Sequence, residues 1–139
     1  MYLGAYWPKL NFRKLKEIGI TTIVNLMEEN LYDPTYLGFS YLHKGFADDS
    51  YLSHDYLEEI LTFIDLHLNN GGKVLVHCSM GISRSPGIIV AWLLKKNPRW
   101  SWRDAISYIE KTKFIAPAVE LRESILDYLE KSDKYRRGD

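Results

Sequence analysis

The stretch KVLVHCSMGISRSP, residues 73–86, decides the fold of this chain, because it joins an apolar strand to a helix through one short turn. KVLVH (73–77) is compact, apolar and typical of a buried strand. Pro86 fits the first turn of a helix, where its missing N–H costs no hydrogen bond. Between them lie Cys78, the only cysteine, and Arg84. The stretch therefore predicts a strand–loop–helix unit with a thiol at the carboxyl end of the strand.

The segments on either side of this unit alternate between strand and helix periods. ITTIVNL (20–26) and FSYLHKGF (39–46) predict two further extended segments. Asn11, Ser53 and Ser101 are placed as helix N-caps, and Ser101 with Asp104 resembles a capping box. The predicted helices span 12–18, 54–70, 87–96, 102–113 and 119–131.

Strands that alternate with helices predict an α/β fold with a largely parallel central β-sheet flanked by helices. The 139 residues contain no linker-like tract or internal repeat, so we expect a single domain over residues 1–139. In such sheets, ligands bind beyond the carboxyl ends of the strands. Cys78 lies at such an end.

Composition narrows the classes of partner and cofactor. Eighteen basic residues balance eighteen acidic ones, which gives no general attraction for nucleic acid or for an anionic membrane. One cysteine permits no internal disulfide, which favours an intracellular, cytoplasmic location, and no run approaches the ~20 apolar residues of a membrane span. The four histidines lack metal-ligand spacing and there is no nucleotide-binding glycine fingerprint, so we expect no metal and no cofactor. The oligomeric state stays open.

The turn after Cys78 predicts an anion site. A strand–turn–helix unit directs successive backbone N–H groups into one concavity, and the following helix adds its positive end. Gly81 permits the tight backbone that such a loop needs, and Arg84 offers a planar fork for two phosphate oxygens. The ligand that fits such a site is a tetrahedral dianion. The expected phosphate-binding residues are Ser79, Met80, Gly81, Ile82, Ser83 and Arg84.

The same donors stabilise an ionised sulfur, which gives Cys78 a chemical role. A thiolate beneath a phosphate can attack phosphorus and form a phosphocysteine intermediate. Ser85 is placed to donate a hydrogen bond to the sulfur when it leaves, and we expect His77 to support the loop. A lone cysteine is most often a small buried hydrophobe, but the combined pattern is hard to reach by chance.

At these residues the chain resembles the cysteine-based protein tyrosine phosphatase superfamily, most closely its small dual-specificity branch. HCSMGISRS (77–85) matches the His-Cys-x5-Arg-Ser/Thr loop completely. Ala118 departs from the family, which usually has an asparagine after the proline of this turn, often as a support of the loop. The remaining similar segments are MYLGAYWP (1–8), LKEIGITTIVNL (15–26), FIDLHLNNGGKVLVHC (63–78), AWLL (91–94) and FIAPAVELRESILDYLE (114–130).

The resemblance implies a general acid on the loop after the second strand, roughly 30 residues before the cysteine. GFADDSYLS (45–53) offers two aspartates. An ungapped register from Phe39 puts Asp48 on the acid position, with Asp49 in reserve.

The resemblance also implies a phosphatase that acts on phosphotyrosine and phosphoserine/threonine in a phosphorylated protein. Two other functions stay open: a catalytically silent phosphopeptide-binding module, and a phosphatase acting on a phospholipid or an RNA 5′ phosphate. The variable loop positions Ser79, Met80, Ile82 and Ser83 carry no charge, which argues against a polyanionic lipid head group.

Overall fold

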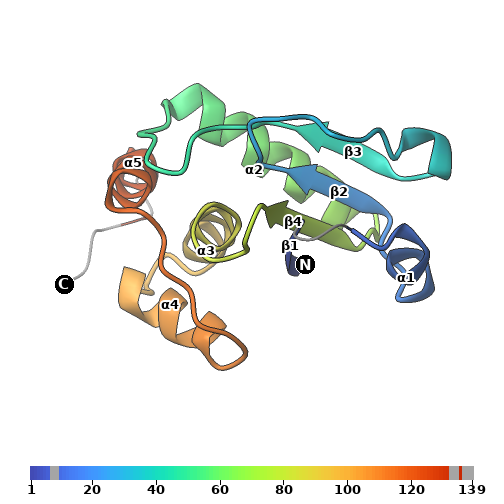
Figure 1. Ribbon diagram of the computed structural model, residues 1–139. Helices are drawn as coiled ribbons and strands as arrows, with labels where there is room; N and C mark the ends of the chain where they lie inside the picture. Colours follow the sequence, from blue (N-terminus) through green and yellow to red (C-terminus); the bar gives the residue numbers. More distant parts are fainter. Residues whose placement is uncertain (7–9, 132–134, 136–139) are drawn as a thin grey trace.

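The computed structural model describes residues 1–6, 10–131 and 135 (Figure 1). Trp7 and Pro8 of the predicted opening segment lie outside the described residues. One parallel sheet has the strand order β1-β4-β2-β3, so the predicted α/β class is confirmed. The strands are β1 (Tyr2–Ala5), β2 (Thr22–Asn25), β3 (Ser40–His43) and β4 (Val74–Cys78).

Strand β1 is the element that the sequence pattern missed. It pairs in parallel with β4, so that Gly4 lies beside His77 and Ala5 beside Cys78. Its residues YLGA are few and partly exposed, and they show no clean alternation of apolar and polar side chains. Pairing with the buried strand β4 therefore makes this segment a strand, and it brings Gly4 to the cysteine loop.

The helices agree with the predicted ones to within a few residues. Asn11 and Ser53 accept hydrogen bonds as N-caps, and Ser101 and Asp104 form the predicted capping box. The 3-10 turn η1 (Thr35–Leu37) lies in a segment predicted as loop. The helices are α1 (Phe12–Glu17), α2 (His54–Asn69), α3 (Arg84–Lys96), α4 (Trp102–Glu110) and α5 (Val119–Glu130).

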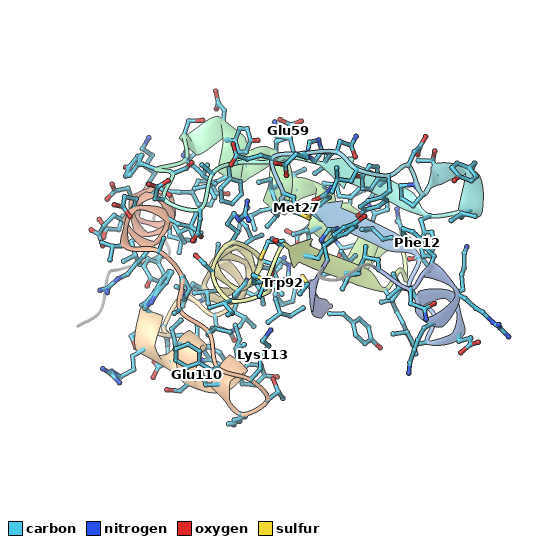
Figure 2. The ribbon with its side chains drawn as sticks, viewed as in Figure 1. Phe12, Met27, Glu59, Trp92, Glu110 and Lys113 are labelled. Atoms are coloured by element: carbon cyan, nitrogen blue, oxygen red, sulfur yellow. The ribbon has the colours of Figure 1, made fainter. Side chains whose placement is uncertain are left out.

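The two faces of the sheet are covered unequally. Helix α1 covers one face, where Phe12 packs with Ile23 and Leu75 (Figure 2). Helices α2 and α3 cover the other face, where Val24 and Val76 belong to the larger core, and α4 and α5 pack against α3. Alternate residues of β2 and β4 thus enter different cores.

The direction of the strands fixes the position of the cysteine loop. All the strands point toward the side of the molecule where α3 and α5 lie (Figure 1). Helix α3 is buried along most of its length, so the loop that precedes it is tied to the centre of the fold. In the part of the chain that the structure describes, no helix is both long and apolar enough to cross a membrane.

Candidate active site

Cys78 is the last residue of β4, and residues 79–83 connect it to α3. Gly81 lies in the left-handed region at φ +73°, and its backbone N–H donates a hydrogen bond to the Cys78 sulfur over 3.3 Å. A Cβ at Gly81 would lie 3.1 Å from the Gly4 carbonyl oxygen and 2.9 Å from the Lys113 ammonium nitrogen. The tight turn therefore requires glycine here, as the sequence predicted.

A pocket of about 280 Å³ opens above this turn and brings together three of the four predicted catalytic residues, Cys78, Arg84 and Asp48. Only 2 % of the Cys78 surface is exposed, so its thiol lies at the floor of the pocket. Asp49 does not line the pocket, and neither do Ser79, Gly81 or Ser85. Among the described residues, the lining consists of Asp48, Cys78, Met80, Ile82, Ser83, Arg84 and Ala116.

Ser85 lies in the first turn of α3 and is fully buried. Its hydroxyl oxygen is 3.2 Å from the Cys78 sulfur and 3.2 Å from the carbonyl oxygen of Gly4. One hydroxyl proton serves only one of these acceptors at a time. When the thiol is protonated it donates to Ser85, which donates to Gly4; when the sulfur is ionised, the hydroxyl can turn and donate to it.

The loop that carries the two aspartates is fixed to the end of β2. A Cβ at Gly45 would lie 2.1 Å from the Met27 carbonyl oxygen, so only glycine allows this approach of backbone to backbone. The Tyr56 hydroxyl donates to the Gly45 carbonyl, and the Tyr56 ring meets the buried Phe46 edge-on at 6.3 Å. Sequence reasoning missed all of these contacts. Together they hold the turn that contains Asp48.

Arg84 connects this loop to the cysteine loop. Its Nη1 donates to the Phe46 carbonyl oxygen over 3.0 Å. A guanidinium has five N–H donors in a planar fork, so this bond leaves several free for an anion. The hydrogen bond thus fixes the plane of the arginine side chain over the pocket.

His77 is fully buried beneath the loop. Its Nδ1 faces the Cys78 carbonyl at 3.3 Å and is therefore the protonated nitrogen, while Nε2 accepts a hydrogen bond of 2.5 Å from the Tyr32 hydroxyl. Burial lowers the pKa of His77 to about 4; the bond to the Cys78 carbonyl opposes this shift, and nearby His43 adds to it. Burial raises the pKa of Tyr32, which stays a hydroxyl donor. Sequence reasoning did not identify Tyr32.

The segment before α5 supports the cysteine loop through its backbone. The Ala116 N–H donates to the Ile82 carbonyl over 2.8 Å, and the Ala118 N–H donates to the Ser83 hydroxyl over 2.9 Å. Ala118 therefore supports the loop through its backbone N–H, although it lacks the asparagine side chain that the resemblance implies at this position. Among the described residues, no cluster of three or more histidines, cysteines or carboxylates could hold a metal ion.

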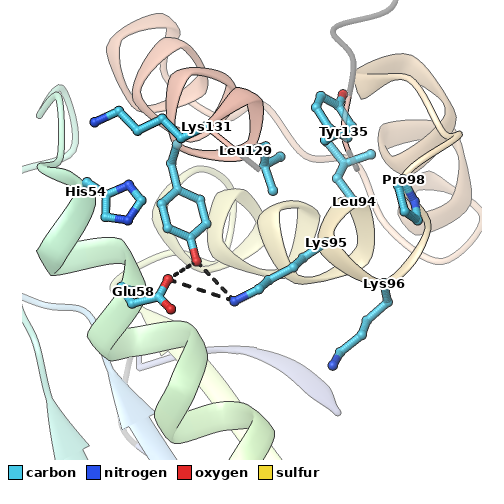
Figure 3. A pocket seen from close by; sticks show the side chains of 10 residues that line it. His54, Glu58, Leu94, Lys95, Lys96, Pro98, Leu129, Lys131 and Tyr135 are labelled. Atoms are coloured by element: carbon cyan, nitrogen blue, oxygen red, sulfur yellow. Dashed lines mark hydrogen bonds and ion pairs between the residues drawn. The ribbon is translucent and has the colours of Figure 1, made fainter. Parts of the chain in front are cut away.

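A second pocket, of about 440 Å³, lies between α2, α3 and α5 (Figure 3). The Tyr128 hydroxyl donates to Glu58, and Lys95 lies 3.9 Å from the same carboxylate. Lys96 forms an ion pair of 3.0 Å with Asp65. Two of its lysines are thus already neutralised, and the described residues that line it include neither cysteine nor arginine. It therefore lacks the nucleophile and the guanidinium that the smaller pocket combines.

Comparisons with known proteins agree on one family. Residues 1–131 match the family model described as dual specificity phosphatase, catalytic domain. Protein phosphatase Slingshot of Drosophila melanogaster is 28 % identical over 148 residues, with 99 % of this chain and 14 % of the relative covered. Human dual specificity protein phosphatase 5 is 30 % identical over 132 residues, with 92 % and 33 % covered.

A solved structure extends the similarity to the fold. The crystal structure of a human tyrosine phosphatase-like serine/threonine/tyrosine-interacting protein superposes with a TM-score of 0.76 and is 27 % identical. The match covers 93 % of this chain and 90 % of that one. The chain spans 14 % and 33 % of the two curated relatives above, so their names describe much longer proteins.

Proposed function

This chain belongs to the dual-specificity phosphatase family, and from that premise we propose that it hydrolyses phosphate monoesters on protein side chains. The observation that carries the proposal is one pocket of about 280 Å³ lined by Cys78, Arg84 and Asp48. These residues supply a nucleophile, a phosphate-binding cation and a proton donor. The proposed reaction needs no metal and no cofactor.

In the first step, the ionised sulfur of Cys78 attacks phosphorus. A sulfur–phosphorus bond forms as the bond from phosphorus to the ester oxygen breaks. The free N–H groups of Arg84 and the backbone amides of residues 79–84 bind the other phosphate oxygens. The Asp48 carboxylic acid gives its proton to the departing oxygen, which leaves as a tyrosine, serine or threonine hydroxyl.

In the second step, water hydrolyses the phosphocysteine. The Asp48 carboxylate takes a proton from the water while the water oxygen attacks phosphorus. The sulfur–phosphorus bond breaks, and the electron pair returns to Cys78. The Gly81 N–H, 3.3 Å from the sulfur, and the Ser85 hydroxyl, 3.2 Å from it, then stabilise the thiolate. His77 supports the loop beneath and takes no proton.

The nucleophile is tested by phosphate release from p-nitrophenyl phosphate. We expect Cys78→Ser to reduce kcat by at least about a thousandfold, because a hydroxyl at this position is not ionised. Vanadate should still protect the variant against thermal unfolding, since the arginine and the loop amides remain. Turnover at the wild-type rate in Cys78→Ser would refute the mechanism.

The acid is tested with two leaving groups. We expect Asp48→Ala to slow phenyl phosphate by about a hundredfold or more and p-nitrophenyl phosphate much less, because nitrophenolate leaves without a proton. Asp49→Ala is the matched control, since Asp49 does not line the pocket. A larger loss in Asp49→Ala than in Asp48→Ala would move the acid to position 49.

A phosphopeptide-binding module without turnover is the second candidate. A structural neighbour carries the name of a phosphatase-like interacting protein, which favours this possibility. Retention of Cys78, Arg84 and Asp48 in one pocket favours the enzyme. Turnover of p-nitrophenyl phosphate by the wild type, lost in Cys78→Ser, separates the two.

The proposed cellular setting follows from the nucleophile. A reactive thiolate with no second cysteine in the chain needs a reducing compartment, so we place the protein in the cytoplasm. Its proposed partners are phosphorylated proteins. Balanced charge gives no general affinity for nucleic acid or a membrane.

A further inference from the structure

Exposed apolar side chains lie on the cysteine loop and on the segment that precedes α5. We call Met80, Ile82 and Phe114 the apolar rim; their exposed fractions are 57 %, 39 % and 70 %. Met80 and Ile82 line the pocket directly. Single exposed apolar residues are common on proteins, but two that line a pocket of polar chemistry, with a third on the segment hydrogen-bonded to its loop, mark a contact surface.

The position of Phe114 follows from the backbone before α5. The hydrogen bonds from Ala116 to Ile82 and from Ala118 to Ser83 hold this segment against the cysteine loop. Ile115 is buried at 3 % exposure, whereas Ala116 lines the pocket. The order exposed, buried, exposed at residues 114–116 is that of extended backbone, which puts Phe114 on the same side as Ala116, about 6.5 Å further along.

Few charges of the pocket remain for residues beside the phosphate. Arg84 and Asp48 are the only charged side chains in the described lining, and both are committed to the reaction in the proposed mechanism. Lys113 lies between α4 and α5 (Figure 2), and its ammonium nitrogen would be 2.9 Å from a Cβ at Gly81. The surface left for residues that flank the phosphate is therefore mostly apolar.

We infer that the apolar rim selects phosphopeptides with a bulky apolar side chain two residues from the phosphorylated residue. Successive same-side residues of an extended peptide are about 6.5 Å apart, which matches the step from Ala116 to Phe114. When the phosphorylated residue of such a peptide occupies the pocket, the peptide residue two positions away therefore contacts Phe114. This inference deepens the proposed function and rests on it.

The test measures peptide binding and turnover separately. Three fluorescent phosphotyrosine peptides carry leucine, serine or aspartate at both positions two residues from the phosphotyrosine. Their Kd values are measured by anisotropy on the Cys78→Ser protein, and p-nitrophenyl phosphate turnover is measured on proteins that keep Cys78. We expect the leucine peptide to bind about fivefold more tightly than the serine peptide, and the aspartate peptide to bind no better than serine.

Phe114→Ser, added to the Cys78→Ser protein, should reduce the leucine preference to less than about twofold. In the protein with Cys78 intact, Phe114→Ser should leave p-nitrophenyl phosphate turnover unchanged within about twofold, because that substrate has no flanking residues. Tyr36→Ser is the matched control: Tyr36 is 81 % exposed and precedes β3, at the opposite end of the sheet. It should leave both readouts unchanged.

A leucine preference that survives Phe114→Ser would overturn the inference, and so would a preference for aspartate. Absence of p-nitrophenyl phosphate turnover in the wild type would overturn the proposed enzymatic activity. The peptide Kd values would then still show whether the apolar rim selects an apolar side chain. The two failures are therefore distinguishable.

Discussion

Burial of His77 makes the stability of the fold depend on pH in a defined window. The ordinary pKa of the imidazole is 6.5, and in the fold it is lowered to about 4, mainly because the ring is fully buried. The unfolded chain therefore binds a proton at His77 between these two values, whereas the folded chain does not. The contribution of neutral His77 is fully present above about pH 6.5 and is lost as the pH falls toward about 4.

The expected magnitude follows from the two pKa values. Each pKa unit between the unfolded and folded states corresponds to about 1.4 kcal/mol, so the full separation corresponds to about 3 kcal/mol. At about pH 4.5, about 2.5 kcal/mol of the free energy of unfolding should already be lost. That is a large share of the ~5–15 kcal/mol that stabilises a typical domain.

The assay is urea unfolding followed by tryptophan fluorescence, in steps of about half a pH unit from about pH 7 to about pH 4.5. His77→Gln is the comparison protein, because an amide can donate to the Cys78 carbonyl and accept from Tyr32 but does not titrate. Carboxylates and the other histidines are common to both proteins, so their effects cancel in the difference. We expect the wild type to lose about 2.5 kcal/mol more than the variant.

Equal pH dependence in the two proteins, within about 0.5 kcal/mol, would refute the reasoning. A second observable reads the same property directly. In an NMR titration of the folded protein, the His77 ring signals should show a midpoint near the lowered pKa of about 4. A midpoint near 6.5 would mean that the ring does not stay buried and neutral.

Three further predictions concern the loop, the core and a cap. Gly81→Ala places a side chain on a residue with φ +73° and should reduce stability by about 1–2 kcal/mol and lower kcat/KM for p-nitrophenyl phosphate; unchanged urea unfolding would contradict this. Ile64→Ala in α2 empties a fully buried site and should cost about 2–5 kcal/mol, against less than about 0.5 kcal/mol for Leu66→Ala, which is 54 % exposed on the same helix. Ser101→Ala removes the capping box and should lower the free energy of unfolding by about 1 kcal/mol, while Ser101→Asp should retain most of it in the same assay.

The helices were predictable because their signals are local. The Ser53 and Ser101 caps act on N–H groups three residues away, and the apolar positions of α2 recur at the helix period. Strands β2, β3 and β4 were also predicted. The predicted segments for β2 and β3 were longer than the strands, and the one for β4 had the right length but began one residue early. The apolar runs at β2 and β3 continue beyond the last ladder hydrogen bond, and only the partner strand sets where pairing ends.

Strand β1 was not predictable from its own four residues. Its edge position leaves it partly exposed, so its sequence lacks the strict apolar pattern that predicts a strand. One contact of the active site was therefore not predictable either: the Gly4 carbonyl in β1 accepts a hydrogen bond from the Ser85 hydroxyl beneath Cys78.

The sequence by itself determined that Cys78 lies near Gly81, Arg84 and Ser85, since a strand, a short turn and a helix start fix those positions through backbone geometry alone. Tertiary structure decided the rest, including which aspartate lines the pocket and the support of His77 by Tyr32. The supporting hydrogen bonds join residues separated by 38, 45 and 81 positions: Arg84 with Phe46, His77 with Tyr32, and Ser85 with Gly4. Such pairs meet only when the sheet and helices have packed, and no local preference of either partner specifies the other.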